Sequence, residues 1–319
     1  MTERKPSPDG VDAAAKRVAG QVTRTPILPA EADGERFLVK AECLQQSGSF
    51  KLRGATNRLL QLSEEEKRRG VVAFSSGNHA QGVALAAQRL GIEAVILMPA
   101  DAPKVKLAAT EAAGARVLLF DRLSESREEI GARLAAERGC VLVPSFDDVD
   151  VIEGQGSAGV EIREQLGGHP DKVVIPCGGG GLASGIALAL PGAEIVVVEP
   201  EGWDDMGRSL AAGEVVPVAP DAPPTRCDAL QTLRVSPLTF GVLRERGAKA
   251  LAVSEAEVER AMAFAMRRLR IVAEPGGAVA LAAVLAGKAG PLSERTVVVV
   301  SGGNVDPTLY ADILSRSAG

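Results

Sequence analysis

The sequence predicts an α/β fold in which mostly parallel strands alternate with helices. From residue 70 onward, short β-branched runs alternate with stretches rich in Ala and Leu. This alternation is typical of βαβ units, whose helices cover both faces of a parallel sheet. Three loops that follow such runs are rich in Gly, Ser and Asn. Sites in these folds form at the carboxyl ends of strands, so these loops are where we expect chemistry.

The expected strands are short and apolar. They are "VVAFS" at 71–75, "EAVILM" at 93–98, "ARVLLF" from 115, "KVVIP" at 172–176, "EIVVVE" at 194–199 and "TVVVV" at 296–300. Expected helices include "HAQGVALAAQRL" at 79–90 and "SESREEIGARLAAE" at 124–137. The acidic residues near the start of the second suit the positive end of a helix dipole.

Composition narrows the function classes. The chain has 319 residues, 46% of them hydrophobic, and its formal net charge is -5. This length favours two domains of about 100–200 residues each. We expect no nucleic-acid partner because the sequence has no basic stripe, and no membrane partner because no apolar run approaches the ~18 residues of a span. The charged N-terminus lacks the apolar stretch of a secretory signal, which favours a soluble, cytoplasmic protein.

The cysteines point to no metal or disulfide framework. Cys43, Cys140, Cys177 and Cys227 lie far apart without a C-x-x-C pair, and the chain has two histidines. Neither zinc ligation nor disulfide bonding is suggested, and reduced thiols are expected.

The segment "PCGGGGLASG" at 176–185 predicts a phosphate site. It connects an apolar strand to an apolar helix, so its backbone N–H groups and the helix dipole can converge on one anion. A plain flexible turn is disfavoured, because four glycines there would cost conformational entropy without gain. However, Gly178-x-Gly180-x-x-Ala183 also satisfies the relaxed dinucleotide fingerprint, with Glu199 about 20 residues further on. A nicotinamide oxidoreductase and a noncatalytic ligand-binding module therefore remain alternatives.

Four motifs together carry a family resemblance. They are "SGSFKLRGA" at 47–55, "SSGNHAQG" at 75–82, "GGGGL" at 178–182 and "SGGNVD" at 301–306. In this order they resemble the serine/threonine dehydratase and serine racemase branch of fold-type II pyridoxal 5′-phosphate enzymes. The resemblance runs from about residue 20 to residue 308, nearly the whole chain.

The resemblance implies an architecture. It is an α/β fold of two open, twisted, mostly parallel sheets, each flanked by helices, with the active site between two domains. Residues 1–47 and 147–319 would form the large cofactor-binding domain, and residues 48–146 the small domain. A homodimer or homotetramer is expected.

The resemblance also implies the cofactor contacts. Lys51 would bind pyridoxal 5′-phosphate as a Schiff base and then serve as the base for the substrate α-proton. Phe50 would lie against the pyridine ring, Asn78 would bond the phenolic oxygen and Ser301 would face the pyridine nitrogen. The phosphate would be held by the backbone N–H groups of Gly178, Gly179, Gly180, Gly181 and Leu182.

Substrate contacts follow from the same resemblance. Donors around the α-carboxylate would come from Ser75, Ser76, Gly77, Asn78 and His79. Ser76 would also be the second acid/base, on the face opposite Lys51. Arg127 would meet an anionic group of the substrate; its alternative is an exposed helix residue that pairs with Glu128 or Glu129.

The stretch "VEPEGWDD" at 198–205 resembles a cation-binding loop of this branch. Glu199, Asp205 and the carbonyl of Trp203 would be the ligands, and such hard oxygen ligands suit Mg²⁺ or Ca²⁺. The alternative is a solvated acidic turn.

A serine at position 301 favours β-elimination. Because a hydroxyl cannot keep the pyridine nitrogen protonated as a carboxylate does, the ring is a weaker electron sink and prompt loss of a β-leaving group is favoured. We therefore expect L-threonine or L-serine to be converted to a 2-oxo acid and ammonia. Serine racemase and 3-hydroxyaspartate dehydratase are the alternatives within the family, because "RCDALQTL" at 226–233 and "EPGGA" at 274–278 depart from the commoner family forms.

Overall fold

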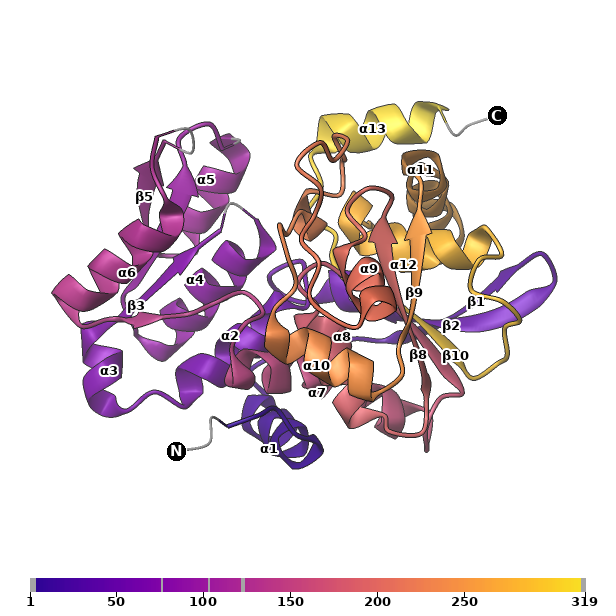
Figure 1. The fold of residues 1–319 in the computed structure, drawn as a ribbon, viewed down its shortest axis with the longest axis horizontal. Helices are drawn as coiled ribbons and strands as arrows, with labels where there is room; N and C mark the ends of the chain where they lie inside the picture. Colours follow the sequence, from indigo (N-terminus) through magenta and orange to yellow (C-terminus); the bar gives the residue numbers. More distant parts are fainter. Residues whose placement is uncertain (1–3, 76, 103, 122–123, 317–319) are drawn as a thin grey trace.

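The computed structural model describes residues 4–75, 77–102, 104–121 and 124–316. These residues form two β-sheets with helices on both faces of each (Figure 1). The smaller sheet lies to the left in Figure 1 and the larger to the right. The predicted α/β fold class, with two mostly parallel sheets, is confirmed.

The larger sheet has six strands in the order β1-β2-β10-β7-β8-β9. Its strands are β1 (Ile27–Ala32), β2 (Glu35–Ala41), β7 (Lys172–Pro176), β8 (Glu194–Pro200), β9 (Lys249–Val253) and β10 (Thr296–Val300). Only β1 and β2 pair antiparallel, as a hairpin at the sheet edge. Its helices are α1 (Pro8–Val18), α7 (Val149–Gln165), α8 (Gly181–Ala189), α9 (Asp205–Ala212), α10 (Pro237–Glu245), α11 (Glu255–Phe264), α12 (Pro275–Leu285) and α13 (Pro307–Arg316). Shorter turns are η1 (Glu42–Leu44), η2 (Asp228–Leu230) and the π-helix η3 (Ala265–Leu269).

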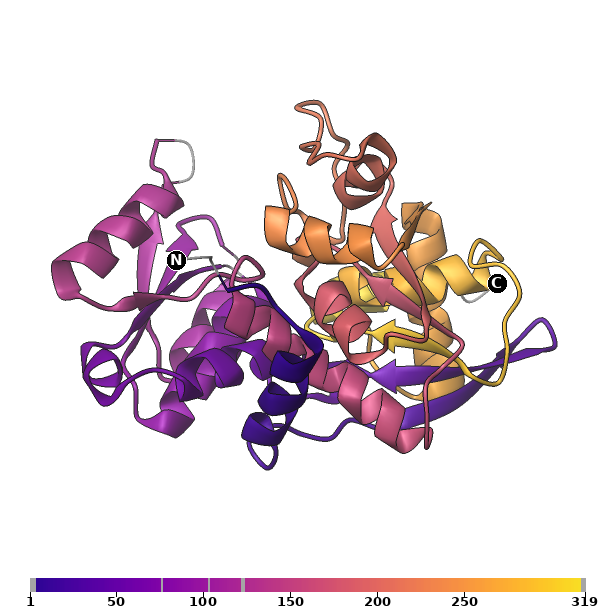
Figure 2. The ribbon, with the colours of Figure 1, turned by 60° about the horizontal axis from the view of Figure 1, so that its bottom comes forward.

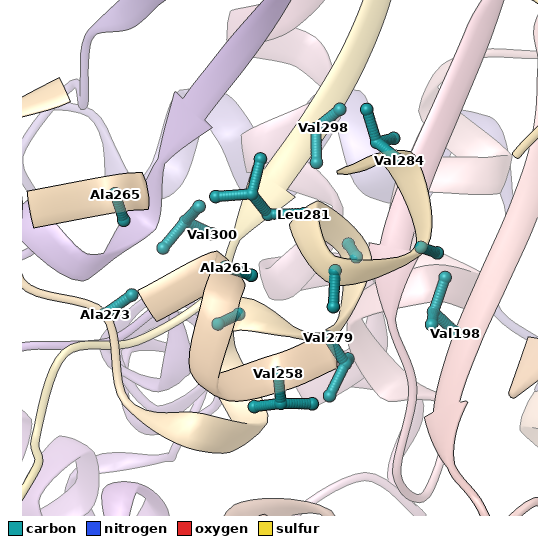
Figure 3. Close-up of a cluster of buried hydrophobic side chains, with 14 of the residues drawn as sticks. Val198, Val258, Ala261, Ala265, Ala273, Val279, Leu281, Val284, Val298 and Val300 are labelled. Carbon is teal, nitrogen blue, oxygen red and sulfur yellow. The ribbon is translucent and has the colours of Figure 1, made fainter. Parts of the chain in front are cut away.

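The two faces of this sheet are covered by different helices. Successive side chains of a strand point to opposite faces. Accordingly, Val298 and Val300 of β10 pack with α11 and α12 in the cluster drawn in Figure 3, whereas Val297 and Val299 pack with α7 and α8. Figure 2 shows α1 (indigo) beside the long helix α7 (pink), and Val11 of α1 belongs to the same core as α7 and α8. The sheet is thus buried on both sides, as its continuous valine runs require.

The smaller sheet is wholly parallel, in the order β5-β4-β3-β6. Its strands are β3 (Val71–Phe74), β4 (Ala94–Pro99), β5 (Arg116–Phe120) and β6 (Val141–Leu142), and its helices are α2 (Lys51–Leu60), α3 (Glu64–Arg69), α4 (Asn78–Leu90), α5 (Lys104–Ala112) and α6 (Arg127–Arg138). Leu52 of α2 and Val83 of α4 pack on one face, and Leu134 of α6 packs on the other.

All six predicted strands are present, with ends that differ by about one residue. The prediction missed the β1–β2 hairpin, β6 and β9. Pro29 interrupts the apolar pattern of β1, β6 is two residues long, and β9 ("KALAV") has an exposed lysine and weak β-formers. The predicted domain boundaries stay a prediction, although each sheet takes its strands from one side of them.

No helix in the described part of the chain combines the length and apolar character that crossing a membrane requires. All four cysteines are buried free thiols.

A buried ion network joins α2 to the elements around the larger sheet. Arg53, two residues after Lys51, donates to both carboxylate oxygens of Glu42 at 2.7 and 2.8 Å and to both of Glu161 at 2.7 and 2.8 Å. Lys40 donates to Glu161 at 2.5 Å. Arg53, Glu42 and Lys40 have no exposed surface. Two cations therefore balance two carboxylates, which is the condition under which buried charge is tolerated.

Breaking this balance should destabilise the protein. We expect Arg53→Met to lower the free energy of unfolding by about 3–5 kcal/mol, since Glu42 keeps a buried charge without its cation. In Arg53→Met/Glu42→Gln the remaining charges, Lys40 and Glu161, still balance, and most of the loss should be recovered. Urea unfolding followed by circular dichroism measures both. A double variant as unstable as the single one contradicts the charge-balance explanation.

Candidate functional site

Lys51 lies where the two sheets meet. It is the first residue of α2, and the residue before it, Phe50, donates its backbone N–H to the carbonyl of Ser301 at 3.1 Å. Ser301 directly follows β10, so α2 begins at the carboxyl end of the larger sheet. A β-bridge between Ser49 and Gly302 fixes this approach. Three residues predicted to act together, Phe50, Lys51 and Ser301, are thereby brought together.

The environment of the Lys51 amine favours its neutral form. Its Nζ donates to the carbonyl of Ser145 at 2.8 Å and lies 5.1 Å from the centroid of the Phe50 ring. Burial lowers the pKa of Lys51 to about 8, because desolvation disfavours the ammonium form. A lysine in such a setting is suited to act as a nucleophile and as a base.

The predicted phosphate loop forms a glycine-lined cradle between β7 and α8. Gly180 has φ +85, a left-handed conformation that favours glycine, and it caps α8. At the other three positions neighbouring atoms leave little room for a Cβ, which would lie 3.2 Å from the Leu230 Cα at Gly178, 2.3 Å from the Phe146 ring at Gly179 and 3.1 Å from the Phe146 Cβ at Gly181. The first intrahelical bond of α8 runs from Ser184 N to the Gly180 carbonyl. The N–H groups of the preceding turn are therefore oriented as an anion requires.

The loop after β3 is held from both sides. The Ser75 hydroxyl accepts from the Gly77 N–H at 3.1 Å. Asn78, the first residue of α4, donates to Glu274 at 2.5 Å and accepts from the Asn304 side chain at 2.8 Å. Glu274 precedes α12 and Asn304 follows β10, so the smaller sheet's loop is fastened to the larger sheet.

His79 acts as a buttress in this arrangement. Its Nε2 lies 2.8 Å from the Val143 carbonyl, so this nitrogen carries the proton and donates. Burial, with a smaller effect of the Lys51 charge, lowers the pKa of His79 to about 3. The ring is therefore neutral at physiological pH, and its side chain holds α4 against the segment after β6.

The structure does not describe the side chains of two predicted site residues. Ser76 lies outside the described residues. Arg127 is the first residue of α6, whose N-cap is Ser126, but its side chain is outside the description.

The predicted cation ligands Glu199 and Asp205 are fully buried, so the solvated-turn alternative is wrong. Glu199 ends β8 and accepts from the N–H groups of Met206 and Gly207 at 2.9 and 2.8 Å. Neither oxygen of Asp205 has a hydrogen bond of ordinary geometry within the described residues, although the N–H groups of Asp205 and Val235 lie near it. Burial raises the pKa of Glu199 well above its usual range and that of Asp205 to about 6.

The described residues around Glu199 and Asp205 do not make up a metal site by themselves. The described portion of the chain contains no group of three His, Cys, Asp or Glu side chains that could hold a metal ion. The Trp203 side chain donates to the Pro223 carbonyl at 2.8 Å and its N–H to the Pro200 carbonyl at 3.0 Å. Any cation there would rely on the two carboxylates and on backbone oxygen.

Comparison with known proteins decides the family. The family model "Pyridoxal-phosphate dependent enzyme" matches residues 18–303. The chain belongs to this family. It is 44% identical to an L-threo-3-hydroxyaspartate ammonia-lyase of a Pseudomonas species, over 94% of this chain and 96% of that one. Its fold matches maize serine racemase with a TM-score of 0.91 at 35% identity, covering 98% of both chains. It also matches the processed form of threonine deaminase isoform 2 from Solanum lycopersicum with a TM-score of 0.87 at 33% identity, covering 99% of this chain and 96% of that one.

The residues present fit pyridoxal phosphate. The glycine loop leads into the N-terminus of α8, where backbone N–H groups can hold a phosphate, and a half-buried lysine of lowered pKa lies at the same junction. The nicotinamide alternative is excluded by the family.

Sequence reasoning missed four contributors to the site. They are Ser145, Phe146, Glu274 and Asn304. Asn304 and Glu274 lie in motifs that were noticed, "SGGNVD" and "EPGGA", but their contacts with Asn78 span more than 190 residues of sequence. Ser145 acts through its backbone carbonyl, so its identity carries no signal.

The lowered pKa of Lys51 can be measured directly. In the cofactor-free chain, modification of Lys51 by an amine reagent should rise with pH with a midpoint near 8, whereas an ordinary lysine has its midpoint near 10.5. The sign follows from burial, which disfavours the protonated and unreactive form. Peptide mass spectrometry after short pulses at each pH resolves the residues. A Lys51 midpoint at the ordinary value contradicts a desolvated amine.

Proposed function

We propose that this protein is an ammonia-lyase that converts an L-3-hydroxy amino acid to a 2-oxo acid and ammonia. The observation that carries the proposal is the desolvated Lys51 amine, which follows Phe50 at the junction where the Phe50 N–H meets Ser301 and where the Ser145–Phe146 segment contacts the glycine loop. Ser301 is 4% exposed and offers a hydroxyl rather than a carboxylate. As argued from the sequence, a hydroxyl at the pyridine nitrogen favours loss of a β-leaving group.

Each part of the site has a role in this reaction. Pyridoxal phosphate, when bound, supplies an electrophilic carbon for the substrate amine and an electron sink for Cα. The N–H groups of Gly178–Gly181 and Leu182 would hold its phosphate, Asn78 would bond its phenolic oxygen, and Phe50 would pack against its ring. Lys51 would bind it and would take the α-proton onto Nζ, because a pKa of about 8 leaves this amine partly neutral near physiological pH.

The start of α4 would hold the substrate carboxylate. The positive end of a helix dipole and the first-turn N–H groups of Asn78 and His79 suit an anion. The Gly77 N–H would exchange its bond to Ser75 for one to the carboxylate. Ser76 would stand opposite Lys51 and Arg127 would meet a second anionic group of the substrate where one is present.

L-threonine and L-serine are the substrates that the sequence predicts. L-threo-3-hydroxyaspartate is a second candidate, which the relative with 44% identity and the cationic Arg127 favour. The segment at 226–233 would help to select the substrate side chain. Its Leu230 packs against Gly178 and Gly276, beside the glycine loop.

A substrate panel tests the proposal. Incubation with L-serine, L-threonine and L-threo-3-hydroxyaspartate should release equal amounts of ammonia and 2-oxo acid from at least one of them. Lys51→Ala should lower turnover by at least about 10³-fold, because no other described side chain at the junction is a basic amine. Lys67→Ala, on the exposed helix α3, is the matched control and should leave turnover unchanged.

Product stereochemistry separates lyase from racemase. A ratio of D-serine to pyruvate well above one from L-serine would overturn the lyase assignment. Should D-serine form as a minor product, Ser76→Ala should remove it while leaving elimination largely intact.

We further propose that Glu199 and Asp205 bind Mg²⁺ or Ca²⁺ together with the Trp203 carbonyl. Two buried carboxylates close in sequence are costly when only the charge of Arg208 acts on Asp205 and neither makes an ion pair within the described residues, and a divalent ion would offset that cost. The turn adjoins the phosphate loop, because Glu199 and Asp205 both act electrostatically on Cys177, the residue before Gly178.

Chelation tests this cation. Chelator should lower the thermal midpoint of the wild-type protein, and Mg²⁺ or Ca²⁺ should restore it by linkage. Asp205→Asn should abolish this response and, by removing a buried unpaired charge, should stabilise the chelated protein. A wild-type midpoint indifferent to chelator and to added cation would refute the site.

A further inference from the structure

We propose that Phe146 is a positioning residue that couples the phosphate loop to the Lys51 amine. Its ring lies on Gly179, and the carbonyl of the preceding residue, Ser145, accepts from Lys51 Nζ. One dipeptide thus contacts both the loop assigned to the phosphate and the residue assigned to the chemistry. The inference rests on the proposed role of the glycine loop.

The contacts of Phe146 explain two of the four glycines. A Cβ at Gly179 would lie 2.3–2.5 Å from three ring carbons of Phe146, and one at Gly181 would lie 3.1 Å from the Phe146 Cβ. Neither glycine has a positive φ, so the backbone conformation does not demand glycine there. Gly180 differs, because its φ is +85 and its Cβ would meet Met206 and Thr239 at 2.8 and 2.9 Å. Gly179 is therefore glycine because of the aromatic ring, and Gly180 because of its backbone and other neighbours.

The segment that carries Phe146 is held along its length. The Val143 N–H donates to the Val72 carbonyl of β3, and the Val143 carbonyl meets His79 Nε2. On the other side, Asp148 caps α7 and accepts from Arg58 of α2 at 3.1 Å. A segment fixed at both ends cannot shift at Ser145 without moving the ring at Phe146. Displacement of the ring should therefore loosen the Ser145 carbonyl and admit water to Lys51.

A double-variant cycle tests the contact with the loop. Gly179→Ala should raise the dissociation constant for pyridoxal phosphate by at least about 30-fold, and Phe146→Ala by about 5- to 10-fold. Phe146→Ala removes the clash between the ring and the methyl group that Gly179→Ala adds. The dissociation constant of the double variant should therefore lie within about threefold of that of Phe146→Ala alone. Gly180→Ala is the matched control. It should raise the dissociation constant by the same factor in the wild-type and the Phe146→Ala backgrounds. Equilibrium dialysis of the full chain measures all of these constants.

The second measurement is the pH midpoint for modification of the Lys51 amine. In Phe146→Ala the pH midpoint for modification of Lys51 should move upward from about 8, since water that reaches Nζ relieves its desolvation. Phe146→Tyr, which keeps the ring, should keep the wild-type midpoint. Phe120→Ala, the same truncation in the core of the smaller sheet, should lower stability without moving the midpoint.

The outcomes separate this inference from the function on which it rests. If Gly179→Ala is as harmful in the Phe146→Ala background as alone, or if Phe146→Ala leaves the Lys51 midpoint unchanged, the coupling is refuted and the glycine loop keeps its role. If neither Gly179→Ala nor Gly180→Ala weakens cofactor binding, the loop does not hold the phosphate. Both the coupling through Phe146 and the proposed role of the glycine loop are then refuted.

Discussion

Burial of one amine at the junction of two sheets is the constraint on which the site depends. An ammonium group taken out of water is disfavoured, so the fold must either pair Lys51 with a charge or accept a lowered pKa. Within the described residues, the partners of its Nζ are the Ser145 carbonyl and the face of the Phe50 ring, and neither is a carboxylate. These neutral partners tolerate the cation without holding it as a carboxylate would. The amine consequently remains available for covalent chemistry and for proton transfer.

The parallel topology makes this arrangement possible. Loops that leave the carboxyl ends of parallel strands gather at one edge of each sheet, and here those edges face each other. Ser75 follows β3, Phe146 follows β6, the glycine cradle follows β7 and Ser301 follows β10. A hydrogen bond donated by Asn78 to Glu274 and one donated by Asn304 to Asn78 then tie the two edges together. The charge-balanced network of Arg53 fixes the helix that carries Lys51, at a point two residues from the reacting amine.

Local patterns predicted the parts of the fold that depend on local chemistry. The valine runs at 172–176 and 296–300 identify buried strands because both their faces are covered, and the glycine-rich loops stand out because few other residues suit them. The prediction missed β1 and β9 because they are edge strands, which need less apolar surface, and it missed β2 because charged residues interrupt its apolar pattern. Within the site, Lys51 and Gly180 could be assigned from a motif. The partners of Asn78, the carbonyl of Ser145 and the ring of Phe146 could not, since tertiary contacts alone bring them near.

The packing around Gly178–Gly181 gives reasons for glycine that the sequence motif does not show. As a sequence, four glycines indicate a phosphate cradle for which the N–H groups are the whole explanation. In the structure the first glycine meets Leu230, the second and fourth meet Phe146, and the third meets Met206 and Thr239 and alone needs a left-handed backbone. The cradle is therefore shaped by the segments packed around it as much as by its own flexibility. Because the Ser145–Phe146 segment also contacts Lys51, the packing of the glycine loop and the desolvation of the amine depend on the same segment.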